Sequence, residues 1–228
     1  MKVYGHIRLV ELRAERPETW DFGDATHAKV VMPACADSET EMQEKGFTFA
    51  DRTLRTTINV AKLSADLQKL QRMPIVETEN HRDAIFRIAH ASFTRDRRFH
   101  ITPWCDQEVS ALVLKEWADQ LGPTLVCLFH DQPIGFLNLK GLGSVTAETA
   151  LQKPETLFVH LAAVEEKYRI TGAAMGLYAR AIQIARERGY MRLEGRISSL
   201  NTSVMNVYAS FGAVFSDPED VFLKALPR

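Results

Sequence analysis

Alternating apolar and polar positions mark one strand in the first third of the chain. Within 49–63, every second residue falls on the same side, a period of two that predicts a half-buried strand. That side carries Leu54, Thr56, Ile58 and Val60. Before it, 37–47 is polar and helix-like, with Asp37 or Ser38 as a cap and Gly46 as its stop.

After residue 73, segments in which apolar residues recur at every second position alternate with segments in which they recur at every third or fourth position. Strands are predicted at 75–77, 124–130, 134–141, 156–164, 191–197 and 213–226. Helices are predicted at 81–93, 107–121, 172–188 and 203–211. This order predicts a mixed α/β sheet. We therefore predict an N-terminal degenerate α/β half domain at 1–72 and a larger domain at 73–228.

Composition narrows the function classes. The 228 residues are 46% hydrophobic and 25% charged, which is ordinary for a globular protein. The net charge of -1 provides no overall electrostatic attraction to nucleic acid or to anionic membranes. Cys35, Cys105 and Cys127 lack a C-x-x-C spacing, so neither a disulfide nor a metal site is predicted. The start lacks a signal-like apolar stretch and no stretch approaches a membrane span, so we expect a cytoplasmic protein.

The segment 168–176, YRITGAAMG, leads from a basic residue through a glycine into an apolar helix. The backbone N–H groups of about 170–174 are expected to lack partners within the helix, where the helix dipole favours negative charge. Gly172 leaves room for a phosphate oxygen and Arg169 can add a charge-assisted contact. The segment is either a cradle for a pyrophosphate or a turn whose glycine serves packing alone.

The stretch 159–213 resembles the GCN5-related N-acetyltransferase superfamily. The likeness rests on three parts in order: the strand end Ala162-Ala163-Val164, the segment Arg169-Ile170-Thr171-Gly172-Ala173-Ala174, and the spacing of Asn201, Tyr208 and Gly212. The resemblance implies a mixed, mostly antiparallel sheet flanked by helices, and transfer of an acetyl group from acetyl-CoA to an amine. Ala174 departs from the family's most typical glycine pattern.

The same resemblance implies cofactor-binding roles. Residues 169–174 would bind the pyrophosphate of acetyl-CoA. The backbone of Ala162, Ala163 and Val164 would border the pantetheine arm, because the family splays this strand from the one at 191–197. Asn201 would lie near that arm, although an N-cap is its alternative.

Two residues are candidates for the proton transfers. The resemblance makes Tyr208 the donor to the departing thiolate, which suits a phenol whose pKa of about 10 exceeds the 8.5 of a thiol; buried core is the alternative. His160, predicted on the same strand face as Phe158 and Ala162, is either a base for the amine proton or a hydrogen-bonded core histidine.

A finer likeness points to the dTDP-fucosamine N-acetyltransferase type. It rests on the extra N-terminal half domain, on the helix–strand unit that ends with 44–54, on 89–100 and on the Phe-Gly-Ala at 211–213. It implies a nucleotide-linked amino sugar as acceptor, with Arg97 and Arg98 on its diphosphate, and is compatible with a homodimer. The alternatives are a solvated charged loop at 94–100, a different acceptor (an amino acid, a polyamine or a protein N-terminus), and a non-catalytic acyl-CoA-binding module.

Overall fold

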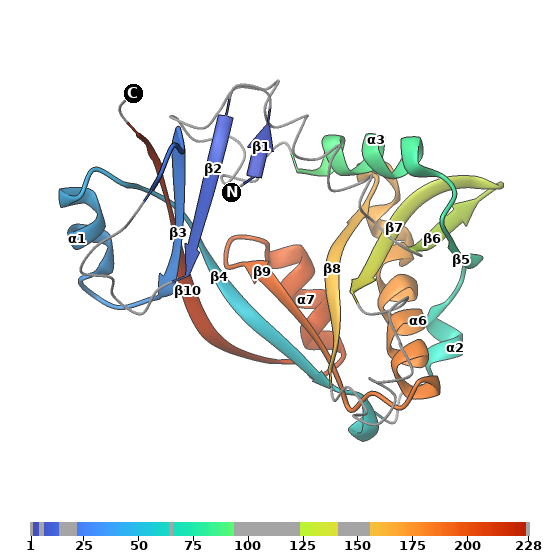
Figure 1. Ribbon diagram of the computed structural model, residues 1–228. Helices are drawn as coiled ribbons and strands as arrows, with labels where there is room; N and C mark the ends of the chain where they lie inside the picture. Colours follow the sequence, from blue (N-terminus) through green and yellow to red (C-terminus); the bar gives the residue numbers. More distant parts are fainter. Residues whose placement is uncertain are drawn as a thin grey trace, which may run out of the picture.

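The computed structural model describes residues 2–4, 7–13, 22–63, 66–93, 124–140 and 156–226. Within these ranges ten strands form one sheet in the order β1-β2-β3-β10-β4-β9-β8-β7-β6-β5 (Figure 1). The strands are β1 (Lys2–Tyr4), β2 (Ile7–Arg13), β3 (His27–Pro33), β4 (Thr48–Asn59), β5 (Ile75–Thr78), β6 (Thr124–Phe129), β7 (Gln132–Lys140), β8 (Thr156–Val164), β9 (Arg192–Ser198) and β10 (Val214–Ala225). The β2–β3 and β8–β9 pairs are parallel and the other pairs with a known register are antiparallel, which confirms the predicted mixed, mostly antiparallel sheet.

Helices cover both faces of the sheet. Those in the described ranges are α1 (Ser38–Glu44), α2 (Leu67–Leu70), α3 (Arg82–Ser92), α6 (Ala173–Glu187) and α7 (Thr202–Ser210), with 3-10 turns η1 (Val60–Lys62) and η3 (Glu166–Thr171). On β7, Leu137 packs with the α6 cluster and its neighbour Phe136 packs with α3. Because successive strand residues point to opposite faces, the sheet has an α6 face, which α7 shares, and an α3 face.

The N-terminal strands belong to the same sheet as the rest. β4, the strand predicted from alternation, lies between β10 and β9. β1, β2 and β3 were not predicted, and in β3 the consecutive residues Val30, Val31 and Met32 are all buried. A strand covered on both faces reads as a continuous apolar run, without the alternation that identifies a half-buried strand. The boundary between 1–72 and 73–228 stays a prediction.

An ion pair between a half-exposed arginine and a buried carboxylate lies where α1 joins the sheet. Asp220 of β10 is fully buried and accepts hydrogen bonds from Arg52 Nε at 2.6 Å and Nη2 at 2.9 Å. Ser38, at the start of α1, donates to the same carboxylate at 2.9 Å. The pair with Asp220 raises the pKa of Arg52. The start of α1 is thereby tied to two strands.

The predicted helix boundaries agree with the structure where it describes them. Gly46 follows α1 and Gly189 follows α6, both with positive φ angles, as expected of residues that end helices. The helix predicted at 107–121 and the loop with Arg97 and Arg98 lie outside the described residues. In the described part of the chain, no helix has the length and apolar character needed to cross a bilayer.

Candidate active site

The parallel strands β8 and β9 separate halfway along their length. Their pairing runs from Thr156 opposite Arg192 to Val159 opposite Gly195 and then stops. Beyond this point β9 stays paired with β4 as far as Ser198, and β8 stays paired with β7. Figure 1 shows the two strands diverging toward the end of the sheet where α6 begins. The structure therefore contains the splayed pair of strands that the resemblance implied.

A β-bulge in β8 coincides with the separation. Leu139 of β7 pairs with Val159 and the next residue, Asn138, pairs with Leu161, so His160 is the extra residue. The bulge changes which residues share a face: Ala162 packs in the α6-face cluster, as Val159 does before the bulge. The prediction that His160 shares a face with both Phe158 and Ala162 is therefore wrong. His160 is also exposed, which contradicts the core alternative.

Tyr208 of α7 reaches the separation point from the α6 face. The side chain is fully buried, and its ring packs edge-on against Tyr178 with the centroids 4.9 Å apart. A methyl group placed on Gly195 would lie 2.1 Å from Tyr208 Oη, so the absent side chain makes room for the hydroxyl. Within the described residues no hydrogen bond of good geometry reaches this Oη, although the hydroxyls of Thr56 and Tyr178 lie nearby. A buried polar group of this kind is costly to leave unsatisfied, which is typical of a functional site.

Burial raises the pKa of Tyr208 above its ordinary value, and the nearby hydroxyls of Thr56 and Tyr178 offset only part of the rise. Thr56 Oγ1 donates to the Gly195 carbonyl at 3.2 Å. The phenol of Tyr208 is therefore protonated throughout the neutral range. It can donate a hydrogen bond or a proton to a group at the separation point.

The predicted phosphate cradle follows β8 directly. Residues 166–171 form η3, and Gly172 has a φ of 85°, a left-handed conformation that glycine adopts without strain. A Cβ on Gly172 would meet nothing within 4 Å, so the space beside it is open. Because a 3-10 turn bonds N–H groups to carbonyls three residues back, the free N–H groups are expected mainly from Ala173 onward rather than from Ile170.

The remaining predicted cofactor residues lie around this cradle. Arg169 is exposed and its Nε donates to the carbonyl of Val164 at 3.3 Å, which links the cradle to the end of β8. Ile170 is 95% exposed. Asn201 caps α7, because its side chain accepts from the Val204 N–H at 3.2 Å, as the alternative interpretation expected. Contact of Asn201 with the cofactor arm stays a prediction.

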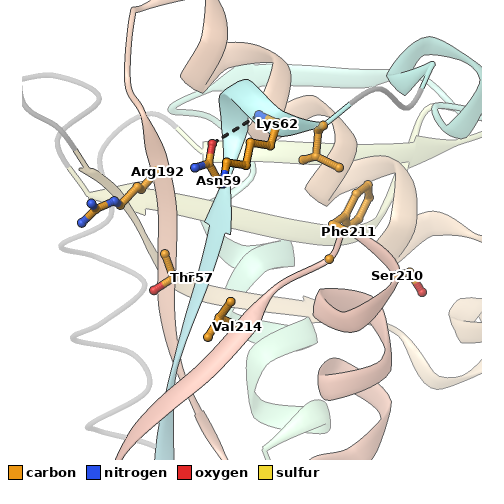
Figure 2. Close-up of a pocket in the computed structure, with 9 residues that line it drawn as sticks. Thr57, Asn59, Lys62, Arg192, Ser210, Phe211 and Val214 are labelled. Atoms are coloured by element: carbon orange, nitrogen blue, oxygen red, sulfur yellow. Dashed lines mark hydrogen bonds between the residues drawn. The ribbon is translucent and has the colours of Figure 1, made fainter.

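A pocket of about 590 Å³ lies at the paired end of β9, away from the cradle. Figure 2 shows the residues that line it: Thr57, Asn59, Lys62, Leu63, Arg192, Ser210, Phe211, Gly212 and Val214. None of the predicted site residues is among them. The Arg192 guanidinium points away from Lys62 in this view, so the two cations do not converge on one anion site.

Two residues of this site, Gly195 and Thr56, were not predicted from the sequence. A glycine in the interior of a predicted strand is a signal of close approach by another group, and Gly195 in the segment 191–197 gave that signal. The role of Thr56 was not detectable, because the strand pattern explained it as a buried face residue.

The comparisons with known proteins agree with this geometry. The acetyltransferase (GNAT) family matches residues 82–213, more than half of the chain. The chain therefore belongs to this family of acetyl-CoA-dependent N-acetyltransferases. No curated protein matches it in sequence.

Three solved structures illustrate the shared fold. A functionally unknown conserved protein from Staphylococcus epidermidis ATCC 12228 aligns with a TM-score of 0.62 at 15% identity, covering 89% of this chain and 74% of that one. A GCN5-related N-acetyltransferase from Sphaerobacter thermophilus gives 0.55 at 13%, covering 87% and 59%. One from Kribbella flavida gives 0.53 at 11%, covering 88% and 69%. At these identities the likeness shows the fold alone, and none of the names specifies an acceptor.

The residues present fit acetyl-CoA. The gap between β8 and β9 is bordered by the small residues Ala162, Ala163 and Gly195, which allow a thin chain to approach the backbone. The open space at Gly172 and the start of α6 suit a phosphate group. The unpartnered hydroxyl of Tyr208 lies at the closed end of the gap, where a sulfur atom would need a proton.

Proposed function

We propose that this N-acetyltransferase acetylates a small-molecule amine in the gap between β8 and β9, with Tyr208 as proton donor. One observation carries the proposal: a buried hydroxyl without a partner faces Gly195 where the two strands separate. A structural tyrosine would be expected to pair its hydroxyl when fully buried.

Acetyl-CoA supplies an acetyl group activated as a thioester. The backbone of Ala162, Ala163 and Val164 positions the arm, and the start of α6 with Arg169 holds the phosphates. A nitrogen–carbon bond forms as the carbon–sulfur bond breaks, and Tyr208 Oη gives the sulfur its proton. The proton that the amine loses returns to Tyr208 or passes to water, directly or through the exposed His160. The amine thus gains the acetyl group and loses one proton, and the sulfur loses the acetyl group and gains one proton.

The acceptor that we propose is the amino group of a nucleotide-linked deoxyamino sugar. The support is the likeness of 89–100 and 211–213 to the dTDP-fucosamine type, with Arg97 and Arg98 as contacts of the diphosphate. An amino acid, a polyamine or a protein N-terminus is the alternative. A cytoplasmic location and a homodimer stay predictions of the sequence.

The test measures thiol release from acetyl-CoA against TDP-amino sugars, free amines and short peptides. For the acceptor that supports release, Tyr208→Phe should lower kcat about 100-fold, within the range typical of a lost general acid, and leave the Kd of acetyl-CoA unchanged. Release with a TDP-amino sugar alone would support the finer proposal.

The control is Tyr178→Phe, which removes the neighbouring hydroxyl but keeps the ring that packs against Tyr208. It should leave kcat within a few-fold of the wild type. A Tyr208→Phe enzyme with wild-type turnover would remove Tyr208 from the mechanism.

A further inference from the structure

Two arginines lie side by side on the α3 face of the sheet, just past the point where β8 and β9 separate. Arg196 of β9 follows Gly195, the last residue that pairs with β8, and lies directly opposite Arg55 of β4. The adjacent residues Gly195 and Thr56 face Tyr208, so the side chains of both arginines point to the other face. The Arg55 side chain is 47% exposed and that of Arg196 is 26% exposed. Both cations are therefore accessible beside the gap.

Three arginines share two carboxylates at this place. Glu219 Oε2 lies 2.9 Å from Arg196 Nη1 and also accepts a hydrogen bond from Nη1 of Arg13, a residue of β2, at 3.3 Å. Asp217 Oδ2 lies 3.3 Å from Arg55 Nε, and the Asp217 carbonyl accepts from Arg196 Nη1 at 3.3 Å. Like charges on directly opposite residues of neighbouring strands repel each other, so the two carboxylates offset a repulsion that is built into the sheet.

Most N–H groups of the two facing arginines have no acceptor in the described part of the chain. A guanidinium group has five N–H donors, but the contacts given above involve Nε alone in Arg55 and Nη1 alone in Arg196. Glu194, the next residue on this face of β9, forms no ion pair with either arginine within the described ranges. Burial, and then the two neighbouring arginines, lower the pKa of Arg196 by more than the carboxylates raise it. Additional negative charge would therefore be favourable here.

A ligand for these donors must present negative charge and several oxygen atoms. Arginine binds both carboxylate and phosphate through paired N–H groups. Because the donors belong to two guanidinium groups on different strands, one carboxylate is expected to satisfy only one of them. The oxygens of a diphosphate are numerous enough to accept from both.

We propose that Arg55 and Arg196 bind the diphosphate of the acceptor, which rests on the proposed transfer of acetyl to an amine. The buried side chains of Tyr208 and Tyr178 fill the α6 face at the separation point, so the acceptor approaches from the α3 face, where both arginines lie. Arg196 directly follows Gly195, so a diphosphate on its guanidinium lies close enough to the gap for one sugar ring to connect the two.

This arrangement defines the class of acceptor. It is an amine joined through a ring or a short chain to a diphosphate, as in a nucleotide-linked amino sugar. Phe158 of β8 is exposed on the same face and can pack against the ring. A polyamine or an amino acid without a phosphate does not belong to this class, because it leaves the N–H groups of at least one arginine without an acceptor.

The first experiment measures the Kd of inorganic pyrophosphate by calorimetry in protein saturated with CoA, so that the cradle at Gly172 is already occupied. Arg55→Gln and Arg196→Gln should each weaken the binding of pyrophosphate about 10-fold, the effect expected when one charge-assisted contact is lost. Both variants should keep the Kd of acetyl-CoA, which shows that they are folded.

Arg192→Gln is the matched control. Arg192 is exposed on the same strand, four residues before Arg196, so its replacement lowers the net charge equally without changing the facing pair. Its Kd for pyrophosphate should equal that of the wild type. Equal losses in Arg192→Gln and Arg196→Gln, or no binding of pyrophosphate by the wild type, would overturn the proposal.

The second experiment compares pyrophosphate with succinate under the same conditions. The wild type should bind pyrophosphate about 10-fold or more tightly than succinate, because the oxygens of one carboxylate cannot serve both arginines. Equal or tighter binding of succinate would overturn the proposal and make the acceptor a carboxylate.

Neither readout depends on acetyl transfer. Pyrophosphate binding that requires Arg55 and Arg196, together with no thiol release for any amine, would count against the proposed function alone. Thiol release with a TDP-amino sugar whose KM is the same in the wild type, Arg55→Gln and Arg196→Gln would count against this inference alone.

Discussion

The two edges of β9 differ in how far they pair with the neighbouring strands. On the β4 side, the pairing continues over seven residues, from Asn59 opposite Arg192 to Thr53 opposite Ser198. On the β8 side it covers four residues and ends at Gly195. The same strand is therefore part of a continuous sheet on one edge and borders an opening on the other.

The polar groups on the two sides differ in the same way. In the strands beyond the β4 edge, Asp220 is matched by Arg52 and Ser38. At the β8 edge, Tyr208 Oη lacks a partner among the described residues. A buried polar group with hydrogen-bond partners stabilises the fold, whereas a buried polar group without one is a candidate for contacting a ligand. We expect substitutions on the first side to change stability and those on the second to change turnover.

The largest effect is expected from Arg52→Met. It leaves Asp220 buried with Ser38 as its remaining donor, and the cost should be about 3 kcal/mol, at the low end for a buried pair because the Arg52 side chain is itself 45% exposed. The free energy of unfolding, from urea titration, should fall by that amount while the kcat of the folded protein is unchanged.

Asp220→Asn is the comparison for that variant. It should cost less, because the Arg52 side chain is 45% exposed and can be hydrated. A loss of kcat in Arg52→Met without a loss of stability would break the distinction between the two edges.

Gly195→Ala should have the next largest effect. The new methyl group would lie 2.1 Å from Tyr208 Oη and displace it. A displacement of about 1 Å in a reacting group can lower turnover about 100-fold. Steady-state kinetics should show this fall in kcat, with a loss of stability of about 1 to 3 kcal/mol from overpacking.

A double variant tests the cause. In Tyr208→Phe the nearest ring atom would be 3.1 Å from the new methyl group, so Gly195→Ala should cost less stability there than in the wild type. Equal costs in the two backgrounds would mean that the clash is relieved without moving Tyr208.

The smallest effect is expected at Asn201, which begins α7 after β9. Asn201→Ala removes the cap on Val204 and should lower stability by about 1 kcal/mol. Asn201→Asp keeps a capping oxygen and should preserve stability. If Asn201 also contacts acetyl-CoA, Asn201→Asp will raise the KM for acetyl-CoA; an unchanged KM would leave Asn201 as a cap alone.

Much of the C-terminal half was predictable from local patterns. The helix α6 and strand β9 follow from spacing and from Gly189, whereas Tyr208 was singled out by the family resemblance, and its role stays a prediction. The bulge at His160 was not predictable, because it depends on the register between β7 and β8, and no local pattern of residues determines that register.

The position of β10 determines when the centre of the sheet can fold during translation. This strand pairs with both β3 and β4, and the Arg52–Asp220 contact spans 168 residues. During translation, β3 and β4 emerge from the ribosome long before the strand that fits between them. The centre of the sheet therefore cannot close until nearly the last described residue has been made, and until then the edges of β3 and β4 that β10 will occupy stay open.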